Sequence, residues 1–241
     1  MVYKESYNVR WHDTDARREV HPSGVLTFMQ ETANRQFEAA GEPLDRIRDE
    51  QGVGFILSRI AIEMREPIHA YEDITVETFT CEGKGYTFPR GFLIKREGRE
   101  VARGMSQWAL IRLADRSLVK TGDFPLSFGD EAELQTEMPI RYRSPRDAAW
   151  EIVGERRIAY SDIDYNMHMN NTKYPDMVCD FLPDSAHTRV TGLSLSYCHE
   201  AAFGDVLTVE RATGENGIYY IRTRLKDVVC LEAMVRTEPC L

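Results

Sequence analysis

Cysteine is scarce in this chain, and its placement does not suit structural chemistry. The 241 residues include five cysteines, and no two of them form a C-x-x-C pair: Cys81, Cys179, Cys198, Cys230 and Cys240. An odd number of scattered cysteines argues against a disulfide framework and against a cysteine zinc site. We therefore expect a protein of a reducing compartment, the cytoplasm.

Long apolar runs and an excess of basic charge are also missing. No stretch approaches 18 apolar residues, and the start, MVYKESYNVRWHD, lacks the apolar centre of a signal peptide. We expect no membrane association. The net charge of −9 argues against a nucleic-acid-binding protein.

Familiar catalytic motifs are absent as well. The sequence has no G-x-S-x-G, P-loop, G-x-G-x-x-G or H-E-x-x-H pattern. Residue types that can bind a metal do occur together, at Asp162, Asp164 and His168, but their spacing matches no standard ligand pattern. We predict neither a metal nor a cofactor.

What the chain does contain is a helix followed by strands. Apolar side chains recur at helical spacing in residues 25–41, just before Gly41: Val25, Met29, Ala33, Phe37 and Ala40. Segments rich in β-branched and aromatic residues follow, separated by turns: 55–64, 73–83, 91–98 and 101–122. This order predicts one long helix followed by a run of mostly antiparallel strands.

The pattern then restarts after a stretch that contains several prolines. A shorter helix is predicted within residues 171–183, with Asn170 or Asn171 capping its start. Further strand-like segments follow: 190–201, 205–214, 217–227 and 228–238. The second part of the chain therefore repeats the organisation of the first.

Short matches relate the two parts. Asp13-Thr14-Asp15 matches Asp162-Ile163-Asp164 at an offset of 149 residues (162 − 13), and Thr75-Val76-Glu77 matches Thr208-Val209-Glu210 at 133 (208 − 75). We interpret this as an internal duplication of one helix-plus-sheet unit. The predicted units are residues 1–130 and 150–241, joined by a linker over 131–149.

The most polar stretch is YSDIDYNMHMNNTKY, residues 160–174. If it is extended, Asp164, Asn166 and His168 alternate onto one side of the chain. With the offset of 149 residues, Arg17 falls opposite Asn166 and Glu19 opposite His168. The two copies share the D-x-D start and differ beyond it, which suggests that one half carries chemistry and the other shapes a substrate pocket.

This stretch resembles a known family. SDIDYNMHMNNTKY is similar to the D-x-N-x-H-x-N-N-x-K-Y segment of acyl-acyl carrier protein (acyl-ACP) thioesterases, the plant enzymes that terminate fatty acid chains and their bacterial relatives. LTFMQETANRQFEAAG, GVGFILSRIAIEM and SYCHEAAFGD resemble further family segments in the right order. The resemblance covers nearly the whole chain. It implies an α+β fold of two tandem hotdog units, each a long helix wrapped by an antiparallel β-sheet.

The implied activity is hydrolysis of fatty acyl-ACP thioesters, which releases the fatty acid and ends its synthesis. Such hydrolysis needs a base for water and a donor for the oxyanion. The implied catalytic residues are Asp164, Asn166, His168 and Glu200. Asp164 or Glu200 would act as the base, Asn166 would orient water or the carbonyl, and His168 would polarise the carbonyl or relay a proton.

The chain departs from the family at one position. The Glu-Cys pair of the family is Glu200-Ala201 here, so the cysteine once discussed as a nucleophile is absent. Cys198 lies three residues before Ala201 and is expected to point elsewhere on a strand. The resemblance then implies direct attack by water with help from a carboxylate.

An acyl chain also needs an apolar pocket and a carrier. The N-terminal unit would line the pocket with Phe28, Met29, Phe55 and Ile56, for which an ordinary core position is the plainer interpretation. ACP is acidic, so docking is expected at basic side chains. The candidates are the cluster of Arg141, Arg143, Arg146, Arg156 and Arg157, with Lys173 and Arg17 or Arg18 as others.

Other functions stay open at this point. An acyl-CoA thioesterase on the same fold would not need a docking surface for a carrier protein. A hotdog hydratase would also use a carboxylate and a histidine, and a non-catalytic acyl-binding protein would keep the pocket without the polar groups. Whether two chains pair as a homodimer is equally open.

Overall fold

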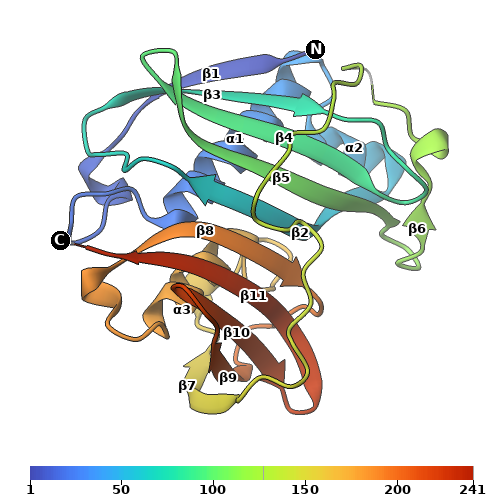
Figure 1. The fold of residues 1–241 in the computed structure, drawn as a ribbon. Coiled ribbons are helices and arrows are strands. Elements are labelled where there is room, and N and C mark those ends of the chain that lie inside the picture. Colours follow the sequence, from blue (N-terminus) through green and yellow to red (C-terminus); the bar gives the residue numbers. More distant parts are fainter. Residues whose placement is uncertain (127, 241) are drawn as a thin grey trace.

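One continuous antiparallel sheet organises the chain, which the computed structural model describes over residues 1–126 and 128–240. The strand order is β1-β3-β4-β5-β2-β8-β11-β10-β9-β7, with β6 paired to β5. The strands of the first half lie at the top of Figure 1 and those of the second half at the bottom. The α+β class predicted from the sequence is confirmed.

Among its described residues, the first half contains six strands and two α-helices. Its elements are β1 (Tyr3–Asn8), the 3-10 turn η1 (Trp11–Asp13), α1 (Pro22–Ala39), α2 (Leu44–Gln51), β2 (Val53–Met64), β3 (Asp73–Thr80), β4 (Phe88–Arg96), β5 (Arg99–Arg112), β6 (Leu118–Val119) and η2 (Thr121–Asp123). A strand lies in each of the four segments predicted from β-type composition, and the fourth segment contains β6 as well as most of β5.

The second half follows after residues 124–126 and 128–150, which form no helix or strand. Its elements are β7 (Glu151–Arg157), η3 (Tyr160–Asp162), η4 (Asn171–Lys173), α3 (Tyr174–Asp180), η5 (Ser185–His187), β8 (Thr188–Tyr197), β9 (Val206–Thr213), β10 (Ile218–Leu225) and β11 (Val228–Pro239). Counted inward from its outer edge, this half has the order β7-β9-β10-β11-β8, and the first half has β1-β3-β4-β5-β2. Strands β3 and β9 lie 133 residues apart (206 − 73), the offset seen in the sequence.

Helix α1 forms where its apolar spacing predicts it. Val25, Met29, Ala33 and Phe37 are all buried, because a spacing of four residues keeps them on one face of the helix. The helix begins at Pro22, three residues earlier than predicted, since proline fits the first helical position. Ala40 was expected on the buried face, but it lies beyond the helix and is exposed.

Helix α2 was not predicted. It is only eight residues long and buries a single side chain, Ile47, so its apolar periodicity is too weak to recognise. Pro43 precedes it, and Gly52 ends it at a φ of +63°, a left-handed conformation that glycine adopts without strain. Pro43 and Gly52 are residue types typical of helix boundaries, so they are the sequence signal for the two ends of α2.

The two halves meet at strands β2 and β8. Residues Arg59–Glu63 pair with Gly192–Ser196, so the sheet runs without a break between the halves. Ile62 and Leu193 are paired there, and both are fully buried. The main hydrophobic core takes side chains from both halves, including Met29 of α1 and Val178 of α3.

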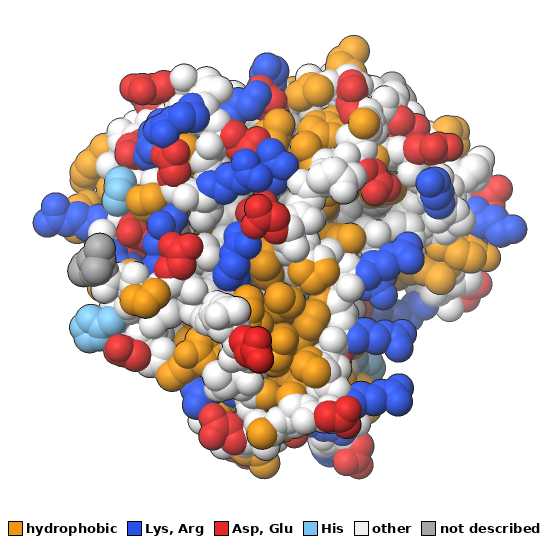
Figure 2. Space-filling model, in the orientation of Figure 1, with side chains coloured by type: hydrophobic (Ala, Val, Ile, Leu, Met, Phe, Trp, Pro, Cys, Tyr) orange, Lys and Arg blue, Asp and Glu red, His pale blue; other side chains and the backbone are white. Residues whose placement is uncertain are grey.

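The predicted linker packs on the outer face of the sheet. It crosses in front of the strands as the yellow-green segment of Figure 1. Its Met138 is buried against Gly192, and its Tyr142 ring stacks on Tyr220 with centroids 6.1 Å apart. Hydrophobic side chains gather beside the linker on this face (Figure 2). The segment therefore covers part of the outer face of the sheet.

The joint between the halves can be tested by removing one buried leucine. Leu193→Ala should lower the free energy of unfolding by about 2–5 kcal/mol, because it leaves a cavity in the shared core. Leu118→Ala is the matched control, since Leu118 is 51% exposed and its loss should cost under about 0.5 kcal/mol. Urea unfolding measures both, and equal losses would contradict the description of the core.

Candidate active site

The segment that carries the predicted site is a tight turn and not an extended strand. The Asp164 carbonyl accepts from the Met167 N–H at 3.0 Å, and the Asp164 N–H donates to the His168 carbonyl at 3.1 Å. Met167 has a φ of +64°, which no extended chain adopts. The predicted alternation of Asp164, Asn166 and His168 is therefore wrong.

Side-chain hydrogen bonding explains this turn. Asp164 Oδ1 accepts from the Asn166 N–H at 2.8 Å, an Asx-type bond that competes with extended structure. The carboxylate of Asp164 thus builds the turn that presents Asn166 and His168.

The first half contains the same turn 149 residues earlier. Asp15 Oδ1 accepts from the Arg17 N–H at 2.8 Å, and Arg18 has a φ of +65°. The Asp15 N–H donates to the Glu19 carbonyl at 2.8 Å, which matches the bond between Asp164 and His168. The backbones of the two copies agree, and the side chains presented by the turn differ.

The residues that flank the turn have structural roles. Asp162 is buried, and its Oδ2 accepts from the Ala159 N–H at 2.8 Å, as Asp13 Oδ2 does from the Arg10 N–H at 2.9 Å. Asn170 Oδ1 accepts from the Thr172 N–H at 2.9 Å, ahead of α3. Asn170 therefore caps the 3-10 turn η4, whereas the N-cap position of α3 is Lys173, whose side chain makes no capping bond. The prediction that Asn170 or Asn171 caps α3 itself is wrong.

His168 and Glu200 meet in space although they are 32 residues apart (200 − 168). The His168 Nε2 lies 3.5 Å from Glu200 Oε2, and the two side chains are 33% and 38% exposed. Glu200 lies beyond the end of β8 at Tyr197, in an irregular segment, and not on a strand as expected. A backbone bridge between His168 and Ala202 holds the two segments together.

Two arginines of the first half complete this group, and neither was predicted. Arg48 of α2 donates from Nη1 to Asn166 Oδ1 at 3.0 Å, and its guanidinium lies 4.9 Å from the centre of the Tyr165 ring. Arg116, in the turn between β5 and β6, donates from Nη2 to Glu200 Oε1 at 2.5 Å. The structure thus brings Asn166, His168 and Glu200 into one group with first-half cations.

This group has the parts for general acid-base chemistry. Glu200 is a carboxylate beside an imidazole, and Asn166 is an exposed amide on the same turn as His168. A carboxylate can orient an imidazole that moves a proton, and an amide N–H can stabilise developing negative charge.

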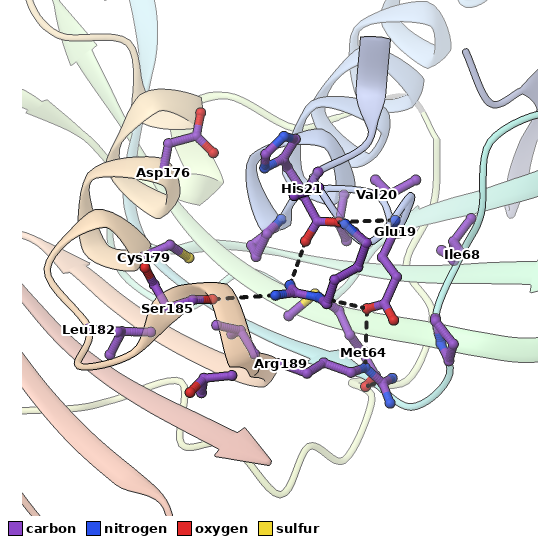
Figure 3. Close-up of a pocket in the computed structure, with 18 of the residues that line it drawn as sticks. Glu19, Val20, His21, Met64, Ile68, Asp176, Cys179, Leu182, Ser185 and Arg189 are labelled. Carbon is purple, nitrogen blue, oxygen red and sulfur yellow. Dashed lines mark hydrogen bonds and ion pairs between the residues drawn. The ribbon is translucent and has the colours of Figure 1, made fainter. Parts of the chain in front are cut away.

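The corresponding turn of the first half lines a cavity of about 480 Å³ that lies between the two halves. Its walls come from the turn at Asp15–Glu19, from α3 and from the start of β8 (Figure 3). Apolar side chains, including Val20, Met64 and Ile68, line part of it.

Ion pairs occupy the polar side of this cavity. Arg17 Nη2 lies 2.5 Å from Asp15 Oδ2, and its Nη1 donates to the Ser185 carbonyl at 3.3 Å. Glu19 and Arg189 point toward each other in Figure 3, with 3.7 Å between Glu19 Oε2 and Arg189 Nε. Burial raises the pKa of the Cys179 thiol in the cavity wall to about 12, so that thiol is a poor nucleophile at neutral pH.

The residues predicted to line an acyl-chain pocket do not line either described cavity. Phe28 and Met29 are buried in the main core, while Phe55 packs edge-on against Phe88 in a separate aromatic cluster. None of Phe28, Met29, Phe55 or Ile56 lines the cavity at Arg17 or the smaller one beside Trp11.

Of the predicted docking residues, Arg17 is engaged in the ion pairs described above and Arg156 pairs with Asp162 at 2.7 Å. The side chains of Arg141, Arg143 and Arg146 are exposed on the linker.

Comparison with known families identifies the family of this chain. Residues 1–123 match the acyl-ACP thioesterase N-terminal domain, and residues 149–230 match the acyl-ACP thioesterase C-terminal domain. The chain belongs to the acyl-ACP thioesterase family. The resemblance seen in the sequence is thereby confirmed.

Curated relatives are distant and longer. The chain is 22% identical over 238 residues to the chloroplastic acyl-[acyl-carrier-protein] hydrolase FATB2 of Cuphea viscosissima, with 91% of this chain and 57% of the relative covered. It is 20% identical over 222 residues to the chloroplastic palmitoyl-acyl carrier protein thioesterase of Arabidopsis thaliana, with 86% and 54% covered. The chain thus spans little more than half the length of these relatives.

Solved structures of family members share the fold over their whole length. An acyl-ACP thioesterase from Bacteroides thetaiotaomicron superimposes with a TM-score of 0.88 at 21% identity, covering 98% of both chains. The 12:0-ACP thioesterase from Umbellularia californica gives a TM-score of 0.85 at 18% identity, covering 99% of this chain and 97% of its own.

Two further observations concern residues 1–126 and 128–240. No helix there has the length and apolar character to cross a membrane. No group of three or more His, Cys, Asp or Glu side chains there is arranged to hold a metal ion.

The ion pairs of the first-half cavity should contribute to stability. Arg17→Met leaves Asp15 and Glu19 without their shared cation and removes a bond to the second half, so it should lower the free energy of unfolding by about 1–2 kcal/mol. Arg18→Met is the control, because Arg18 is exposed and also has a positive φ. Thermal and urea unfolding compare the two, and a loss no greater in Arg17→Met would contradict a structural role.

Proposed function

We propose that this protein hydrolyses the thioester of fatty acyl-ACP, releasing free fatty acid and carrier protein and so terminating fatty acid synthesis. The observation that carries the proposal is the contact between His168 and Glu200 beside the exposed amide of Asn166. Membership of the acyl-ACP thioesterase family supports the same activity.

The proposed architecture is two tandem hotdog units. Residues 1–130 form the unit that holds the acyl chain, residues 131–149 the linker, and residues 150–241 the unit with the catalytic residues. The repeated strand order of the halves and the match of each half to a different family domain support this division. Phe28, Met29, Phe55 and Ile56 stay proposed liners of a pocket that would open beside the core.

The proposed chemistry is attack by water without a covalent intermediate. His168, oriented by Glu200, polarises the thioester carbonyl or relays the proton of the attacking water. The Asn166 amide donates to the oxyanion. Asp164 acts mainly through the turn that it builds, because Asp15 makes the same bond in the half that lacks the histidine. Of the two carboxylates, Glu200 is then the better candidate for the base, acting on the water through His168.

Removing the imidazole tests the site. His168→Ala should lower kcat on acyl-ACP by about 10²–10⁴-fold, the range for loss of a general acid or base. His187→Ala is the control, since His187 is in the same half and exposed, and its side chain bonds to Asp184, away from the candidate site. Release of fatty acid from ACP thioesters of several chain lengths is the measurement. Full activity of His168→Ala would show that the site is elsewhere.

The carrier can be tested separately at the linker arginines. Arg141→Glu combined with Arg143→Glu should raise KM for acyl-ACP several-fold and leave KM for acyl-CoA nearly unchanged, because only the carrier presents a large acidic surface. Equal effects on both thioesters would place docking elsewhere. A wild-type protein that prefers acyl-CoA would favour the acyl-CoA thioesterase.

A further inference from the structure

We propose that Arg48 and Arg116, both in the first half, are positioning residues for Asn166 and Glu200 in the second half. The inference rests on the proposed hydrolysis and adds two residues to its machinery. Both arginines act through another side chain, and neither needs to contact the reacting atoms.

Arg116 is held in place by its own turn. It has a φ of +60°, its N–H donates to the Arg112 carbonyl at 2.9 Å, and Asp115 Oδ1 accepts from the Ser117 N–H at 2.9 Å. The turn directs the guanidinium at Glu200 Oε1, 2.5 Å away, while Glu200 Oε2 faces His168 Nε2 at 3.5 Å. One carboxylate thus bridges a fixed cation and the imidazole, which sets its orientation.

Arg48 decides how the Asn166 amide is used. A guanidinium has only donors, so the amide atom that it contacts at 3.0 Å must be the oxygen. The NH₂ group is then the end of the amide that remains available to a substrate. This arrangement favours Asn166 as a donor to the thioester oxygen over Asn166 as an acceptor that orients water.

Because these contacts are exposed, an effect of Arg116 on catalysis can be distinguished from an effect on the stability of the fold. The Arg116 side chain is 61% exposed and that of Glu200 38%, and ion pairs this open contribute little to folding. Removing Arg116 should leave unfolding nearly unchanged, so a loss of turnover in that variant would come from misplaced catalytic groups.

Single substitutions with matched controls test the inference. Arg116→Ala and Arg48→Ala should each lower kcat on acyl-ACP by about 10- to 100-fold, with KM changed less than about threefold. Added guanidinium should restore part of the lost kcat in Arg116→Ala, and Arg116→Lys should keep more activity than Arg116→Ala. The controls are Arg112→Ala and Arg46→Ala; Arg112 is exposed beside the same turn, and Arg46 pairs with Glu50 on α2.

The outcomes are distinguishable. The controls remove the same charge from neighbouring positions of the chain, so an equal loss in control and test variants would show a general effect of charge on docking and overturn positioning. Unchanged kcat in both test variants of an active protein would overturn this inference alone. A wild-type protein that hydrolyses no acyl thioester would overturn the proposed function and this inference with it.

Discussion

The pairing of β2 with β8 is the interaction on which the rest of the structure depends. It joins Arg59–Glu63 to Gly192–Ser196 and makes one sheet from two halves. Without it, each half would expose the unpaired edge of a long strand, which proteins generally avoid. The pairing also fixes each half's polar turn against the other half, so the site and the first-half cavity both form between halves.

Two turns with the same backbone have different consequences. In the first half the side chains of Asp15, Arg17 and Glu19 are neutralised by one another and by Arg189, and the turn serves to hold the halves together. In the second half the same backbone presents Asn166 and His168 near solvent. The backbone of the turn thus sets where the groups lie, and the side chains decide whether they bind one another or a substrate.

Much of the fold could be predicted because it depends on periodic burial. Helix α1 and the strands follow the spacing of apolar and β-branched residues, and the offsets of 149 and 133 residues recur in the turns and in β3 and β9. The conformation of the turn could not be predicted, because Met167 and Arg18 have a positive φ without being glycine. Alternation in the sequence therefore suggested an extended strand.

The candidate site was predictable only in part. Asn166, His168 and Glu200 came from local composition and a family resemblance, and the structure brings them together. Arg48 and Arg116 carry no such signal: they lie 118 and 84 residues from their partners, and α2 is too short and polar to be recognised. Contacts between the halves depend on the β2–β8 register, which the pattern of neither half contains.

In the proposed site, arginines of the first half complete a group of residues of the second half. A double-mutant cycle on Arg116 and Glu200 measures this most directly, with kcat for acyl-ACP as the readout. If Arg116 acts through Glu200, Arg116→Ala should lower kcat in the wild-type background and change it less than about twofold in the Glu200→Ala background. An equal loss in both backgrounds would contradict the claim.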